Sequence, residues 1–338
     1  MENRTDVPFL WLPGSGPDED ALARMRSYLP RPLKPMGEAW FMSKERKMHQ
    51  ELFTLGAAKL PLRDLHSALE DIASGTQCFG HFEEWDMWLP HMLPDLVLRS
   101  HEHHIFDILL ENTITAFMAV YWTGIPEEYQ GFARDVRLTL GKALMKPELW
   151  EPDPLEPENP ARRIPIFLSR EDRGEALLSD WGSSNAPGGL AAAMAFCLKY
   201  LPDNDLRSWA GALFDIDHPH WRFAVLVWYV GALNVRNPSN SVARAIEKAA
   251  PGITWNNFHA LKAPSGTSDA DFPLDSGYNQ PAGFLDSARL STVLEAMRAQ
   301  LTVERLAAWE TTFWMDPLLA SEPALPSILD RTLATLAA

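Results

Sequence analysis

Residues 105–122 read IFDILLENTITAFMAVYW, and apolar side chains occupy most positions of this stretch. They cover more than one narrow face of a helix, which is wider than the apolar stripe of an ordinary surface helix. Ser100 lies just before the stretch and suits an N-cap, because its hydroxyl can accept a hydrogen bond from a free backbone N–H group. The pattern predicts a helix over 101–122 that is buried between several neighbours.

Helical periodicity continues on both sides of this stretch, with proline or glycine between the segments. We expect Gly75 to end one helix, Pro126 to begin another, and Pro90 and Pro94 to split or kink the helix over 82–98. No strand hairpin and no fixed repeat period is present. The sequence predicts an all-α fold, an irregular array of about thirteen helices packed as helix hairpins. In one version of this array the helices form a superhelix, which resembles a HEAT-repeat protein in shape only. The other expected helices cover 18–29, 38–60, 62–74, 126–145, 170–179, 190–201, 205–213, 221–235, 239–249, 255–261, 285–300, 302–313 and 324–336.

A proline-rich segment divides the chain near its middle. Residues 151–165 read EPDPLEPENPARRIP, with five prolines and four acidic residues. Such a segment cannot form the interior of a helix, so we expect a linker or an extended surface strap. The chain then divides into an N-terminal acidic helical lobe at 1–150 and a C-terminal helical lobe at 166–338. The alternative is one continuous domain crossed by the strap.

Composition excludes several classes of protein. No run of about eighteen apolar residues is present, and the first residues lack the pattern of a secretory signal. Cys78 and Cys197 have no disulfide or zinc spacing, which indicates a reduced, cytoplasmic protein. A net charge of −15 argues against nucleic acid as a ligand, because phosphate binding needs clustered Lys and Arg. We predict no cofactor and no membrane partner.

The negative charge is concentrated in one third of the chain. Residues 51–160 hold nineteen Asp and Glu against seven Lys and Arg, which accounts for −12 of the net charge. Acidic residues beside large aromatic side chains are typical of a surface that attracts a basic protein. The alternative is that the tryptophans belong to the core and the acids are merely solvated. The predicted partner-binding residues are Glu83, Glu84, Trp85, Asp86, Trp88, Glu127 and Glu128.

This cluster favours a non-enzymatic, cytoplasmic binding protein whose acidic half engages a basic protein. Charge would steer the encounter, and buried aromatic side chains would hold the complex. One version is an immunity-type inhibitor that covers the active site of a bacterial toxin, for which a basic nuclease is the natural target.

Two groups of histidines and acids offer an alternative function, a helical metal-dependent hydrolase or lyase. His101, His104, Asp107 and Glu111 fall on one face of the expected helix over 101–122, and imidazole with carboxylate can hold a metal ion. The second group lies within six residues and comprises Asp215, Asp217, His218 and His220. Neither group contains an HExxH motif, and both also suit a solvated helix face or an ordinary helix connection. We therefore assign no catalytic residue and no metal ligand.

Overall fold

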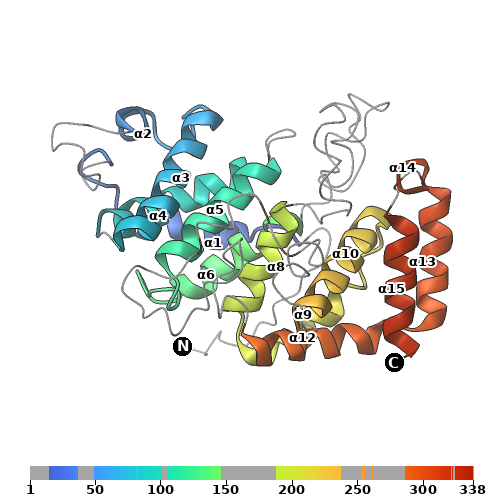
Figure 1. Cartoon of the computed structure of the whole chain (residues 1–338). Helices are drawn as coiled ribbons and strands as arrows, with labels where there is room; N and C mark the ends of the chain where they lie inside the picture. Colours follow the sequence, from blue (N-terminus) through green and yellow to red (C-terminus); the bar gives the residue numbers. More distant parts are fainter. Residues whose placement is uncertain are drawn as a thin grey trace.

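The computed structural model describes residues 15–36, 49–81, 83–100, 106–145, 188–236, 253, 255, 261, 286–320, 322 and 324–337. Every regular element in these ranges is helical, which confirms the all-α fold (Figure 1). The first half contains α1 (Glu19–Tyr28), α2 (Gln50–Leu55), α3 (Leu62–Phe79), α4 (Glu83–Arg99), α5 (Phe106–Val120), α6 (Phe132–Thr139) and the 3-10 helix η3 (Leu140–Met145). The second half contains α8 (Gly188–Tyr200), α9 (Asp203–Ala212), α10 (Pro219–Arg236), α12 (Ser287–Gln300), α13 (Val303–Met315), α14 (Pro317–Ala320) and α15 (Leu325–Ala337).

Helix α5 is buried on several sides, as its sequence predicts. Every side chain from Leu109 to Met118 is buried, and α3, α4 and α8 all pack against the helix (Figure 1). The buried hydroxyls of Thr113 and Thr115 donate to the carbonyl oxygens four residues earlier, so their burial leaves no donor unpaired. The wide apolar surface of α5 therefore organises the N-terminal helices around it.

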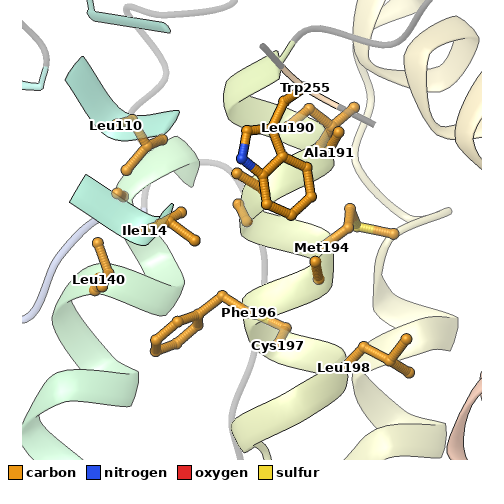
Figure 2. Close-up of a cluster of buried hydrophobic side chains, with 14 of the residues drawn as sticks. Leu110, Ile114, Leu140, Leu190, Ala191, Met194, Phe196, Cys197, Leu198 and Trp255 are labelled. Carbon is orange, nitrogen blue, oxygen red and sulfur yellow. The ribbon is translucent and has the colours of Figure 1, made fainter. Parts of the chain in front are cut away.

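Helix α8 is the main partner of α5 on one side. Figure 2 shows the Phe196 side chain of α8 pointing toward the side on which Leu110 and Ile114 of α5 lie, whereas Met194 lies on the opposite side of α8. All of these residues are buried, and the small side chains at 191–193 let the two helices approach closely. Burying a side chain as large as phenylalanine stabilises the fold by about 1.5–3 kcal/mol.

The C-terminal helices pack on one another and on α8. Helix α12 contacts α8, α9 and α10, and α10 also contacts α13 and α15. The Arg289 guanidinium donates to the Leu198 carbonyl oxygen over 2.8 Å, which ties α12 to α8. The buried apolar residues of both halves form one continuous cluster. The division into two lobes stays a prediction, and the strap over 151–165 lies outside the described residues.

Several helix boundaries differ from the predictions. Helix α3 runs through the buried Gly75 and ends at Gly80, whose φ of 86° suits glycine. Helix α4 is one continuous element despite Pro90 and Pro94, since burial of both rings and their neighbours offsets the lost backbone hydrogen bonds. Helix α6 begins after Gly131, rather than at Pro126. Tertiary packing therefore overrides the local signals at these points.

The array is irregular, as predicted: α5 packs on α3 and α8, and α9 packs on α12, whereas α4 and α5 are consecutive helices that pack on each other. The superhelical arrangement stays a prediction. Within the ranges that the structure describes, no helix combines the length and the apolar character that crossing a membrane requires.

Candidate functional site

The predicted acidic residues lie on α4 and on the loop that follows α5. The helices α4 and α5 pack on each other, and the charge of Asp86 in the first turn of α4 acts on Tyr121 and Glu128, so this turn lies near the end of α5. Glu83 is exposed and Asp86 is half-buried at that first turn, and Glu127 and Glu128 are exposed in the loop. We call these four side chains the acidic face.

The other predicted residues of α4 lie inside. Trp85 and Trp88 are only 2% and 3% exposed, and Glu84 is 8% exposed. The two tryptophans are three residues apart and share the face that packs on the core, where the ring of Trp88 meets that of Phe53 edge-on at 6.4 Å. Burying the large indole side chains stabilises the fold, so they lie in the core and do not serve as anchors on the surface. The surface offered to a partner is therefore acidic and lacks these indoles.

The acidic face carries little compensating positive charge. The Asp86 carboxylate is 2.7 Å from the His81 imidazole, and the Glu127 carboxylate accepts a hydrogen bond of 3.0 Å from the Gly131 N–H group. In the described part of the chain, no Lys or Arg forms an ion pair with any of the four side chains. Arginines pair with five acids elsewhere on the surface, namely Asp95, Asp203, Asp215, Asp217 and Glu295. The guanidinium of Arg137 on α6 lies close enough to interact with the charge of Glu127, so the negative potential is partly offset there and is kept around Asp86 and Glu128.

Tyr121 lies buried near two members of the acidic face. Its ring packs against Phe117 at 4.8 Å, and its carbonyl oxygen accepts a hydrogen bond from the Tyr200 hydroxyl. Burial raises the pKa of the Tyr121 phenol, and the charges of Asp86 and Glu128 raise it further. The Tyr121 hydroxyl is buried without a hydrogen-bond partner among the described residues. An unpaired hydroxyl at this depth is costly unless something binds to it.

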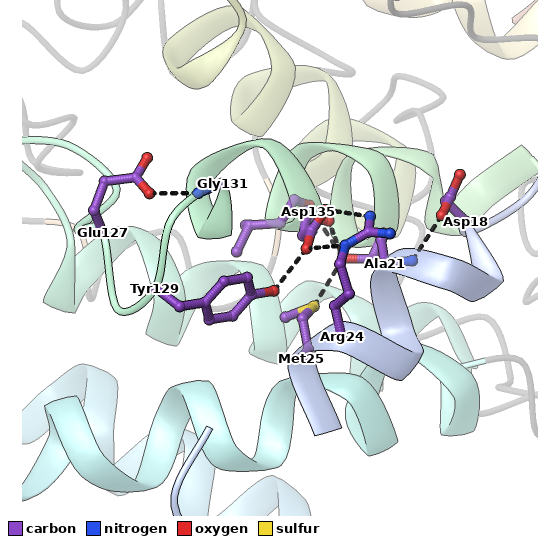
Figure 3. Close-up of polar contacts among 10 residues, drawn as sticks. Asp18, Ala21, Arg24, Met25, Glu127, Tyr129, Gly131 and Asp135 are labelled. Carbon is purple, nitrogen blue, oxygen red and sulfur yellow. Dashed lines mark hydrogen bonds and ion pairs between the residues drawn. The ribbon is translucent and has the colours of Figure 1, made fainter. Parts of the chain in front are cut away.

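A buried ionic network holds the loop that carries Glu127 and Glu128. Asp135 of α6 is 2% exposed and accepts hydrogen bonds from the Arg24 guanidinium at 2.6 and 2.9 Å and from the Tyr129 hydroxyl at 2.7 Å. Figure 3 shows these contacts joining α1, α6 and the loop. The hydrogen bonds to Asp135 raise the pKa of Arg24. The network therefore fixes the loop on the helices beneath it.

Sequence reasoning missed this network. Phe132, Val136 and Thr139 are spaced along one buried face of α6, and Asp135 falls among them. An acid on an apolar face is the signal that could have found it, because a buried carboxylate needs a partner. Its partner Arg24 lies 111 residues away, and no local pattern identifies it.

The histidines and acids at 215–220 do not form a metal site. Asp217 pairs with Arg222 at 2.8 Å, and Asp215 pairs more loosely with Arg305 at 3.4 Å. The His220 ring contacts the carboxylate of Asp316, between α13 and α14, at 3.0 Å. Among the residues that the structure describes, no three His, Cys, Asp or Glu side chains are placed to hold a metal ion.

Burial favours the neutral form of the two histidines of this group. It lowers the pKa of His218 to about 4 and also lowers that of His220. The contact between His220 and Asp316 therefore joins the start of α10 to the end of α13 as a structural link.

The other predicted metal group lies largely outside the described residues. The structure does not describe His101, His104 or the side chain of Asp107. Glu111 is 1% exposed on α5, where its neighbour Asn112 contacts His66 at 2.8 Å.

No protein-family model, no curated protein and no solved structure matches this chain. The roles of its residues therefore have to come from their geometry and chemistry. Of the predicted site residues, the acidic face is the set with the fewest internal partners, and it supports the functional proposal below.

Proposed function

We propose that the chain is a non-enzymatic protein-binding protein whose acidic face engages a basic partner protein. The observation that carries the proposal is the set of exposed and half-buried carboxylates without a Lys or Arg partner among the described residues. Carboxylates left unpaired on a surface attract a basic protein over long range and orient it before contact. The rigid loop and helix beneath them present the charges in a fixed arrangement, which favours specificity.

A cytoplasmic immunity-type inhibitor is the version that this chemistry favours. A basic nuclease toxin presents clustered Lys and Arg that normally contact phosphate, and an acidic surface can cover them. In this version Trp85 and Trp88 support the acidic face from below, and the partner meets carboxylates.

The test compares two variants with the same change of net charge. Glu83→Lys with Glu127→Lys reverses two exposed charges of the acidic face, and Glu51→Lys with Asp330→Lys reverses two exposed charges elsewhere. Tagged protein captures partners from an extract of its own source cells, and rising salt then elutes them. We expect a basic protein to be captured by the wild type and by the Glu51/Asp330 variant, and to be lost with the acidic-face variant. Equal capture by both variants contradicts the proposal.

A further inference from the structure

We infer that the acidic face contains one defined subsite, in which Asp86 and Glu128 hold a single Lys or Arg side chain of the partner above Tyr121. The inference rests on the proposed function and names the chemical group that the face recognises. The two carboxylates come from α4 and from the loop after α5, and Tyr121 ends the helix between them.

The two carboxylates are close enough to repel each other. Partial burial raises the pKa of the Glu128 carboxyl group, and the negative charge of Asp86 raises it further. No basic side chain offsets this effect on Glu128, and among the described residues Asp86 has only the His81 imidazole as an ion-pair partner. A cation placed between the carboxylates would interact favourably with both and remove their repulsion.

The buried Tyr121 hydroxyl is an independent sign of a missing ligand group. It has no partner among the described residues, although Asp86 and Glu128 both act on its phenol group. Contacts with Phe117 and with Tyr200, at 4.8 Å and 2.9 Å, fix the ring and the backbone of Tyr121. The hydroxyl therefore cannot turn away to find a partner elsewhere.

A bound cation would satisfy this hydroxyl. An ammonium or a guanidinium group has several N–H donors, so it can bond to both carboxylates and donate to the phenol oxygen as well. Because the hydroxyl is covered, the side chains that cover it have to turn to admit the cation.

The test measures binding of fluorescent hexa-arginine peptide by anisotropy at low ionic strength. Asp86→Asn with Glu128→Gln removes the two charges of the subsite, and Glu51→Gln with Asp330→Asn removes two exposed charges elsewhere. We expect the subsite variant to bind about tenfold more weakly and the matched variant to change affinity by less than about twofold. If both variants lose affinity for hexa-arginine equally, the subsite is wrong, but the proposal that the acidic face binds a basic partner is not contradicted. Absence of any binding to the wild type overturns both the subsite and the proposed function.

Tyr121→Phe tests the contribution of the hydroxyl to binding separately from that of the two carboxylates. Removal of an unpaired hydroxyl leaves the stability of the free protein unchanged or higher, whereas affinity for hexa-arginine falls about fivefold. Urea unfolding and anisotropy measure the two effects on the same sample. Unchanged affinity overturns the inference, and so does a loss of stability, which would show that the hydroxyl already has a structural partner.

Discussion

Asp135→Asn tests whether the buried network holds the acidic loop in place. The substitution keeps the shape of the side chain but removes its charge, and it turns one of the two acceptor oxygens into a donor. Asp135 accepts three hydrogen bonds, two of them from the charged Arg24, while it is only 2% exposed. Breaking a fully buried ion pair costs about 3–5 kcal/mol. The Arg24 side chain is 39% exposed and can regain water, so we expect a loss at the low end, about 3 kcal/mol.

The assay is urea unfolding followed by circular dichroism, with Asp95→Asn as the matched control. Asp95 also pairs with an arginine of α1, Arg26, at 2.9 Å, but both side chains reach solvent, so its loss should cost about 0–1 kcal/mol. The Asp135→Asn protein should also bind hexa-arginine more weakly, because Glu128 is then less firmly positioned. Equal losses of stability in the two variants would refute the argument from burial.

Three further predictions concern the core and the titrating groups. Phe196→Ala should lower the free energy of unfolding by about 3–5 kcal/mol because it leaves a cavity between α8 and α5. Leu333→Ala removes an exposed side chain of α15 and should cost little, and urea unfolding measures both changes. Burial holds the pKa of His218 at about 4 in the folded protein, so the unfolded state binds its proton first and stability falls as the pH drops from about 6.5 to about 4. A His218→Asn variant should show a shallower fall over that interval, and an equal slope would contradict the assignment. A thiol reagent should modify the exposed Cys78 and spare Cys197, which is fully buried with a raised pKa; rapid modification of both thiols in the folded protein would contradict the packing of α8.

Local sequence patterns predicted the helices well where the pattern and the packing agree. Helix α5 was identified from its wide apolar surface, which is a direct consequence of having neighbours on several sides. The acids at the start of α1 were also informative, since the Asp18 side chain caps the helix by accepting a hydrogen bond from the Ala21 N–H group at 2.7 Å. The prediction of a helix end at Gly75 was wrong, and Pro90 and Pro94 do not split α4, because burial there offsets a local cost that the sequence alone cannot weigh.

The site depended more on contacts between distant residues. Spacing placed Trp85 and Trp88 on one face of α4, but only the packed structure shows that this face is turned inward. Asp316, which contacts His220, lies 96 residues away from it in the chain. Such pairs form when the helices pack together, and no local sequence motif predicts them. The position of the acidic cluster was predictable, whereas its division into exposed acids and buried indoles was not.

Zero-length crosslinking tests the central claim most directly. A carbodiimide joins a carboxylate to a lysine amine only when the two are in contact, and mass spectrometry of the captured complex identifies the joined residues. We predict crosslinks from Glu83, Asp86, Glu127 or Glu128 to lysines of the partner, and these crosslinks should be lost when salt dissociates the complex. Crosslinks confined to acids elsewhere, such as Glu51, Glu295 or Asp330, would show that the partner binds another surface.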